Sequence, residues 1–148
     1  MRKCERGFTV IELIVFFIIL VVLAVVFIVQ KSDLQLRADD QTRKTAINSM
    51  AADLENVFYK QNKYYPDSIS KDNLTAIDPA LFTDPNGYTL SGNECDYTDA
   101  SGQAQTDGDC DYHYAPTGCD KNGHCTGFKL TADMAKEADY EKDSPSAK

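Results

Sequence analysis

The cysteines are the residues of this sequence whose types and spacing most clearly allow chemistry. One stands alone near the N-terminus, Cys4, and the other four fall within 31 residues: Cys95, Cys110, Cys119 and Cys125. In an exported domain, a group of this kind forms two disulfides. Three pairings are possible, and we favour Cys95–Cys110 with Cys119–Cys125 because those two loops do not cross.

Calcium binding is an alternative use of the same region. Carboxylates alternate at Asp107, Asp109 and Asp111, and oxygen ligands of this type suit Ca²⁺. Further acids nearby could complete such a site: Asp96, Asp99 and Asp120. The EF-hand pattern fails, because Tyr112 stands where the turn glycine belongs and Gly118 where the final Glu belongs. We therefore expect a solvated acidic loop without a bound metal. The alternative is that Ca²⁺ is a cofactor bound by these acids.

The remaining polar residues give little support for zinc binding or catalysis. A zinc site would enlist four residues that contain no C-x-x-C pair: Cys119, Cys125, His113 and His124. The sequence has no Gly-rich phosphate loop, no G-x-S-x-G and no H-E-x-x-H. With two histidines and cysteines expected in disulfides, we predict that the protein is not an enzyme.

One carboxylate, Glu12, stands inside an apolar run. The run, Phe8–Val29, has 22 residues and no other charge. As a helix it would span roughly 33 Å, about the thickness of a bilayer core. A carboxylate inside a membrane costs about 2.5–3.5 kcal/mol on insertion scales and needs a partner. Glu12 is therefore a candidate functional residue.

Charge divides the chain at the same place. Residues 1–7 carry a net charge of +2, whereas residues 30–148 carry 12 Lys and Arg against 21 Asp and Glu, a net −9. We expect the basic end to stay in the cytoplasm and the acidic part to lie across the membrane. So acidic a surface repels phosphate backbones, and direct nucleic acid binding is not expected.

Familiar N-terminal segments fit this beginning only in part. A cleaved secretory signal has a shorter apolar core that ends in small residues. A lipoprotein has its cysteine after the apolar stretch, whereas Cys4 precedes it. A plain signal anchor accounts for the length and orientation of the run but not for Gly7 or Glu12.

The segment Gly7-Phe8-Thr9-Val10-Ile11-Glu12-Leu13 resembles the processing site of type IV pilins and type II secretion pseudopilins. That family has a short basic leader ending in Gly, then Phe-Thr, two aliphatic residues, Glu and Leu. The resemblance, which covers residues 1–29, implies that a prepilin peptidase cuts between Gly7 and Phe8 and so removes the leader 1–7. It also implies methylation of the new amino group on Phe8. Glu12 would then pair with the N-terminal amine of a neighbouring subunit and set the axial register, as a polar residue does in a coiled-coil core.

The apolar run continues into a longer predicted helix. Residues 8–30 form the transmembrane or assembly segment, and residues 31–62 a polar and then amphipathic continuation. We expect residues 31–45 to be a solvated stalk, because they are polar nearly all round. From Ile47 to Phe58 apolar residues recur every three or four positions and predict a packing face. Residues 8–60 contain no Pro and no Gly, so the helix should be continuous until Pro66 disfavours it near residues 61–63.

Short strands should follow the helix. Tyr64-Tyr65-Pro66 resembles the Tyr-Pro that follows the long helix of many pilins, and residues 88–90, 111–115 and 126–131 predict strands. We expect a globular head with two disulfides over residues 63–140 and a flexible tail over residues 141–148. The predicted fold class is α+β, with a long N-terminal helix whose C-terminal half packs on a small antiparallel sheet, as in type IV pilins.

The resemblance also implies a function. The chain would be a structural subunit of a type IV pilus-like filament that supports adhesion, motility or DNA uptake. Its partners would be identical or homologous pilin subunits, the prepilin peptidase, the inner-membrane assembly platform and the membrane. It would be a single-pass membrane protein with a cytoplasmic N-terminus before assembly, and an extracellular or periplasmic filament afterwards. The alternatives are a pseudopilin of a secretion or competence system, and a membrane-anchored binding module that never polymerises.

Overall fold

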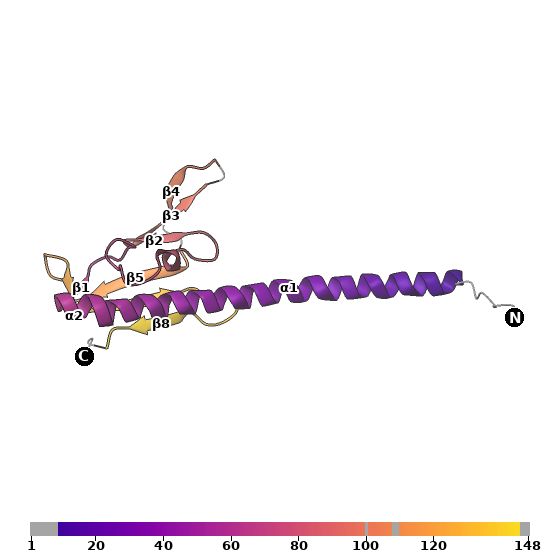
Figure 1. The fold of residues 1–148 in the computed structure, drawn as a ribbon, viewed down its shortest axis with the longest axis horizontal. Helices are drawn as coiled ribbons and strands as arrows, with labels where there is room; N and C mark the ends of the chain where they lie inside the picture. The colour runs from indigo at the N-terminus through magenta and orange to yellow at the C-terminus, as the bar shows by residue number, and fades with distance from the viewer. Residues whose placement is uncertain (1–8, 100, 108–109, 146–148) are drawn as a thin grey trace. The chain divides into compact units, whose positions relative to one another are not determined.

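A computed structural model describes residues 9–99, 101–107 and 110–145 (Figure 1). Helix α1 covers Val10–Asp53, a single π-helical stretch η1 covers Leu54–Phe58, and α2 covers Tyr59–Asn62. The helix ends within the predicted range, where Lys63 takes a left-handed conformation with φ of 67° and its N–H bonds to the Tyr59 carbonyl. The absence of Pro and Gly explains why nothing interrupts α1 earlier.

The chain divides into two compact units, one ending at Leu36 and one starting at Arg37. In the first unit, the described large apolar side chains of residues 10–28 are 45–77% exposed. The helix Val10–Asn62, to which this stretch belongs, is the one candidate membrane span among the described residues, and its most apolar 18-residue window has a mean hydropathy of 3.4. This helix is long and apolar enough to cross a membrane, as the sequence predicts.

In the second unit, the later part of α1 packs against short strands (Figure 1). Three small antiparallel sheets are present among the described residues, with orders β1-β6, β2-β3-β4 and β5-β7-β8. The strand bounds are Tyr65–Pro66 for β1, Thr89–Ser91 for β2, Glu94–Thr98 for β3, Ala104–Asp107 for β4, Tyr112–Thr117 for β5, His124–Cys125 for β6, Gly127–Ala132 for β7 and Tyr140–Asp143 for β8. A 3-10 turn, η2, spans Pro79–Phe82 and precedes β2.

The core forms between one face of α1 and these sheets. The helix contributes buried side chains at three- and four-residue steps: Ala46, Ile47, Met50, Ala51 and Leu54. The strands contribute buried aromatic side chains to this core, including Tyr65 of β1, Tyr112 of β5 and Phe128 of β7. The ring of Tyr65 meets that of Phe128 edge-on with centroids 4.9 Å apart. The predicted amphipathic face therefore does pack into a core.

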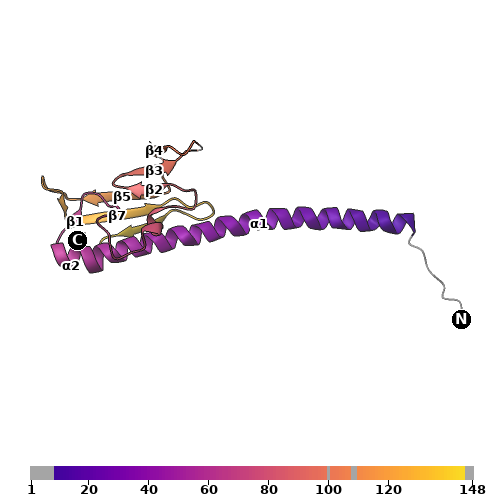
Figure 2. The same cartoon turned by 45° about the horizontal axis from the view of Figure 1, so that its top comes forward.

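The strand prediction was right in outline and wrong in two details. The predicted strands belong to two sheets, because β2 pairs with the unpredicted β3 whereas β5 pairs with β7 (Figure 2). The expected flexible tail was wrong for residues 141–144. Residues 140–143 form β8 beside β7, and the buried Ser144 donates its N–H to the Phe128 carbonyl. Backbone pairing orders a segment that has few apolar side chains to bury.

Candidate functional site

Glu12 lies in the first turn of α1, on the apolar segment. The Thr9 carbonyl accepts the N–H groups of Glu12 and Leu13 at 3.1 and 3.2 Å, so Thr9 lies at the N-cap position directly before α1. A carboxylate in a first turn is favoured by the helix dipole. Around Glu12 the side chains of Val10, Ile11 and Leu13 are exposed. Gly7 and Phe8, the expected cleavage and methylation positions, lie outside the described residues.

A buried ionic network joins α1 to the strands and loops of the second unit. Arg43 donates to Asp111 through Nε at 3.0 Å and Nη2 at 2.7 Å, and to Asp40 through Nη1 at 3.1 Å. Asp40 also accepts the backbone N–H groups of Ala135 and Lys136 at 2.8 and 2.9 Å. Burial alone would raise the pKa of Asp40, but these donors outweigh it and hold the pKa below its usual value.

This network corrects the expectation of a solvated stalk over residues 31–45. Asp40 and Arg43 are buried, with exposed fractions of 0% and 5%. They lie on the same stripe as Ile47 and Met50, with steps of three, four and three residues. That spacing was the signal in the sequence that could have revealed them. Because these two residues are charged, the pattern of apolar positions does not identify them as buried. Only the later residues of the stripe, Ile47 and Met50, are apolar.

The same network occupies one of the calcium candidates. Oδ2 of Asp111 accepts three hydrogen bonds, two from Arg43 and one from Asn86 Nδ2 at 2.8 Å. A guanidinium in direct contact makes this carboxylate a poor cation ligand. Of the other two alternating candidates, Asp109 and the side chain of Asp107 lie outside the described residues. Asp111 is therefore used to hold the helix.

The further acids named for calcium are used in turns and strand pairs. Asp99 accepts hydrogen bonds from the Ser101 hydroxyl and from the Ser101 and Gln103 N–H groups. The Ser101 hydroxyl and these amides lower the pKa of Asp99 to about 2. Asp120 accepts two backbone N–H groups in the same manner, and Asp96 accepts the Thr106 hydroxyl at 3.2 Å. Asp99 and Asp120 thus act as turn-forming residues, and Asp96 makes a contact between two strands.

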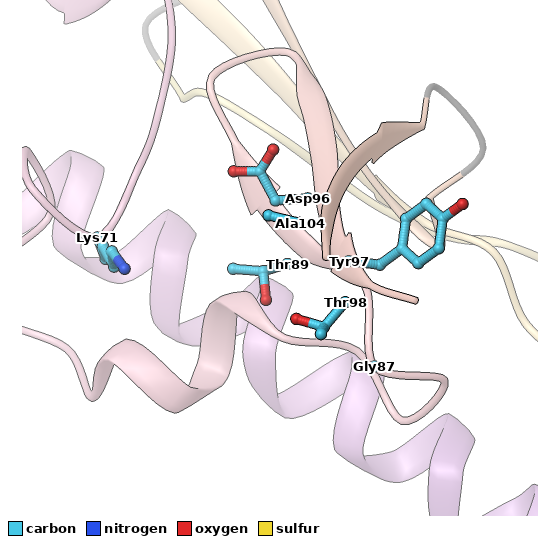
Figure 3. Close-up of a pocket in the computed structure, with 7 residues that line it drawn as sticks. All are labelled: Lys71, Gly87, Thr89, Asp96, Tyr97, Thr98 and Ala104. Carbon is cyan, nitrogen blue, oxygen red and sulfur yellow. The ribbon is translucent and has the colours of Figure 1, made fainter. Parts of the chain in front are cut away.

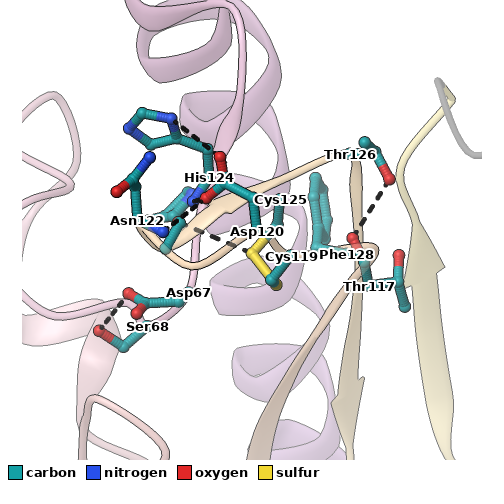
Figure 4. Close-up of a disulfide and its surroundings, with 12 residues drawn as sticks. Asp67, Ser68, Thr117, Cys119, Asp120, Asn122, His124, Cys125, Thr126 and Phe128 are labelled. Atoms are coloured by element: carbon teal, nitrogen blue, oxygen red, sulfur yellow. Dashed lines mark hydrogen bonds and ion pairs between the residues drawn. A yellow bond between two sulfur atoms is a disulfide. The ribbon is translucent and has the colours of Figure 1, made fainter.

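The four cysteines of the second unit form Cys95–Cys110 and Cys119–Cys125, the pairing favoured from the sequence. Figure 4 shows Cys119–Cys125 closing the turn that carries Asp120 and His124. Within that turn Gly123 has a φ of 77°, and a Cβ there would come within 2.8 Å of Asp67 Oδ2. Only glycine fits this close approach.

The four residues considered for a zinc site make other contacts in the structure. Cys119 and Cys125 are bonded to each other, and the His124 ring stacks on Tyr64 with centroids 3.8 Å apart. His113 faces Asp133 at 3.5 Å. Among the described residues, no group of three or more His, Cys, Asp or Glu side chains is arranged to hold a metal ion.

A shallow polar groove of about 190 Å³ lies between the loop at Lys71 and the β3–β4 hairpin (Figure 3). Thr89, Thr98 and Asp96 line it, while the Tyr97 ring points away from the other labelled side chains. Its seven lining residues include no His or Cys that could act beside these hydroxyls. The polar groups that the groove presents are the Thr89 and Thr98 hydroxyls, the Asp96 carboxylate and the Lys71 ammonium.

Comparison of the chain with protein-family models, with curated proteins and with solved structures found no match.

Proposed function

We propose that this chain is a structural subunit of a type IV pilus-like filament, processed by a prepilin peptidase and assembled from the membrane through its N-terminal helix. The observation that carries the proposal is the apolar helix segment of residues 10–28, exposed on all sides, with the single carboxylate Glu12 in its first turn. It follows directly the Gly7-Phe8 sequence that resembles the family's cleavage site.

Two environments can cover such a helix. Lipid covers it while the subunit is stored in the membrane, and the helices of neighbouring copies cover it in a filament core. Covering the exposed apolar surface in either environment is favourable by roughly 25 cal/mol per Å² removed from water. The transfer between them costs little, because each replaces the other's apolar contacts. The head beyond Arg37, which carries both disulfides, would form the filament's outer surface.

Glu12 gives the filament its order. A carboxylate among apolar helices needs a counter-charge, and the amine that cleavage creates on Phe8 of a neighbouring copy supplies one. Because only one axial offset brings these two groups together, their pairing sets the stagger between subunits. Apolar contacts alone would allow helices to slide.

A pseudopilin of a secretion or competence system is the second candidate. The turn at Asp84-Pro85-Asn86-Gly87 and the Tyr-Pro at Tyr65-Pro66 favour it slightly. In the structure, Asp84 Oδ1 accepts the N–H groups of Asn86 and Tyr88, and Asn86 binds Asp111. A membrane-anchored module that never polymerises would not require Glu12.

The substitution Glu12→Ala tests the proposal. The variant should enter the membrane as well as the parent, because it removes an unfavourable charge from the span. It should yield few or no ordered filaments by electron microscopy. Glu94→Ala, which removes an exposed carboxylate from β3, serves as the control and should leave filaments intact. Normal filaments from Glu12→Ala would refute the assembly role.

A further inference from the structure

A second groove lies beside the C-terminal end of α1, and a buried carboxylate, Asp53, belongs to its lining. This open groove has a volume of about 330 Å³. Five helix residues and two loop residues line it: Ser49, Ala52, Asp53, Asn56, Val57, Ala76 and Ile77. Most of these side chains are small or apolar, and they remain at least partly exposed, whereas Asp53 is buried. The groove is therefore mainly apolar, with Ser49 and Asn56 as polar lining residues and one buried acidic residue, Asp53.

Asp53 lacks the partners that a buried carboxylate requires. Its exposed fraction is 4%, and neither carboxylate oxygen has a hydrogen-bond partner among the described residues. The Ala76 N–H is close, but it lies outside hydrogen-bond geometry. Burial raises the pKa of Asp53, and the Ala76 amide offsets this only in part. By contrast, the buried Asp40 has Arg43 and two backbone donors.

The complementary groups occur on the same chain, about 20 residues earlier on α1. Beyond the apolar run, the exposed large apolar side chains among the described residues are Leu34, at 67%, and Leu36, at 36%. Lys31 precedes Leu34 by three positions, so the two side chains lie on one helix face, roughly 5–6 Å apart at Cβ. This face presents one cation and one exposed apolar group.

We propose that the groove at Asp53 receives the Lys31–Leu34 face of a second copy of this chain. The Lys31 ammonium pairs with the Asp53 carboxylate, which turns into the groove, and Leu34 covers Ala52 and Val57. The inference rests on the proposed function, because a filament is what places helices of different copies side by side. It adds a charge-matched contact between heads and helices to the Glu12 pairing at the N-terminus.

Charge reversal tests the contact. Asp53→Asn and Lys31→Asp should each lower the yield of sheared filaments at least about tenfold. Asp53→Asn leaves the Lys31 ammonium without a counter-charge, and Lys31→Asp places two carboxylates against each other at the contact. The combination of Lys31→Asp with Asp53→Lys should restore much of the loss, since the pair is then reversed rather than removed. Lys142→Asp, a charge reversal on β8, is the matched control and should not change the yield.

A stability measurement separates docking from folding. Unfolding of the full detergent-solubilised chain should show Asp53→Asn at least as stable as the parent at pH 7, because the amide avoids an unpaired buried charge. Weaker assembly with undiminished stability is the predicted result. Normal filament yield from Asp53→Asn, or no rescue by the double reversal in a chain that still folds, would overturn the inference while leaving the filament function standing. If the parent itself makes no filaments, both proposals fail.

Discussion

At the scale of the residue, Arg43 links α1 to the segment before β5 in the second unit through ionic contacts. Its guanidinium bridges Asp40 on the helix and Asp111 beside β5, and its own exposed fraction is 5%. Arg43→Met should destabilise the folded chain by about 3 kcal/mol, because it removes the counter-charge of two carboxylates, which keep only neutral donors. Denaturant unfolding of the detergent-solubilised chain measures this loss.

The pH dependence and a surface pair provide the controls. The pKa of Asp40 is below 3.8 in the folded state, so its stabilising contribution is present above pH 4 and is lost as the pH falls through the folded-state value. The difference between parent and Arg43→Met should therefore shrink in acid. Lys129→Met breaks the pair with Glu141, in which both side chains are about half exposed, and should change stability little. Equal effects of the two substitutions would contradict this account of Arg43.

At the scale of the element, the two disulfides should differ in their contribution. Cys95–Cys110 joins residues 15 apart and Cys119–Cys125 residues 6 apart. Because a longer loop loses more chain entropy when closed, replacing the first pair by serines should cost about 3 kcal/mol and the second about 2 kcal/mol. Unfolding of the two double-serine variants tests the order, and a larger loss from the shorter loop would contradict the chain-entropy explanation.

Some elements could be predicted from the sequence alone, and others could not. The long helix and its end near Pro66 follow from local properties, namely the absence of Gly and Pro and the spacing of apolar residues. Strands β3 and β4 do not, because their mostly polar side chains show no clear apolar alternation, and they form strands by pairing with each other and with β2. The same applies to β8, which is ordered by β7 and by the Phe128–Ser144 hydrogen bonds.

The candidate site divides along similar lines. Glu12 could be identified from the sequence because it is the one charged residue in a long apolar run, where a carboxylate is energetically unfavourable. Asp40, Arg43 and Asp53 did not, because charges on a helix are ordinarily solvated and only the folded packing buries them. The disulfide pairing was favoured on loop geometry alone, and the acids of the nearby loop proved to accept backbone and side-chain donors.

At the scale of the whole molecule, the chain combines two parts with opposite requirements. The described residues up to Leu36 expose apolar side chains that water does not tolerate, and those from Arg37 on form a head with its own core and disulfides. In our proposal the first part is stored in lipid and then buried among copies, while the second remains in water. Residues 30–148 carry the net charge of −9, which keeps that surface soluble.

The most direct test of this proposal is mass spectrometry of filaments sheared from cells that produce the chain. We expect the subunit to begin at Phe8, to carry a methyl group on that amine, and to be shorter than the encoded chain by the leader of residues 1–7. The same spectrum should show four cysteines in disulfides. A mature protein that retains Met1, or a chain that is abundant in membranes and absent from every sheared fraction, would contradict the proposal that it is a processed filament subunit.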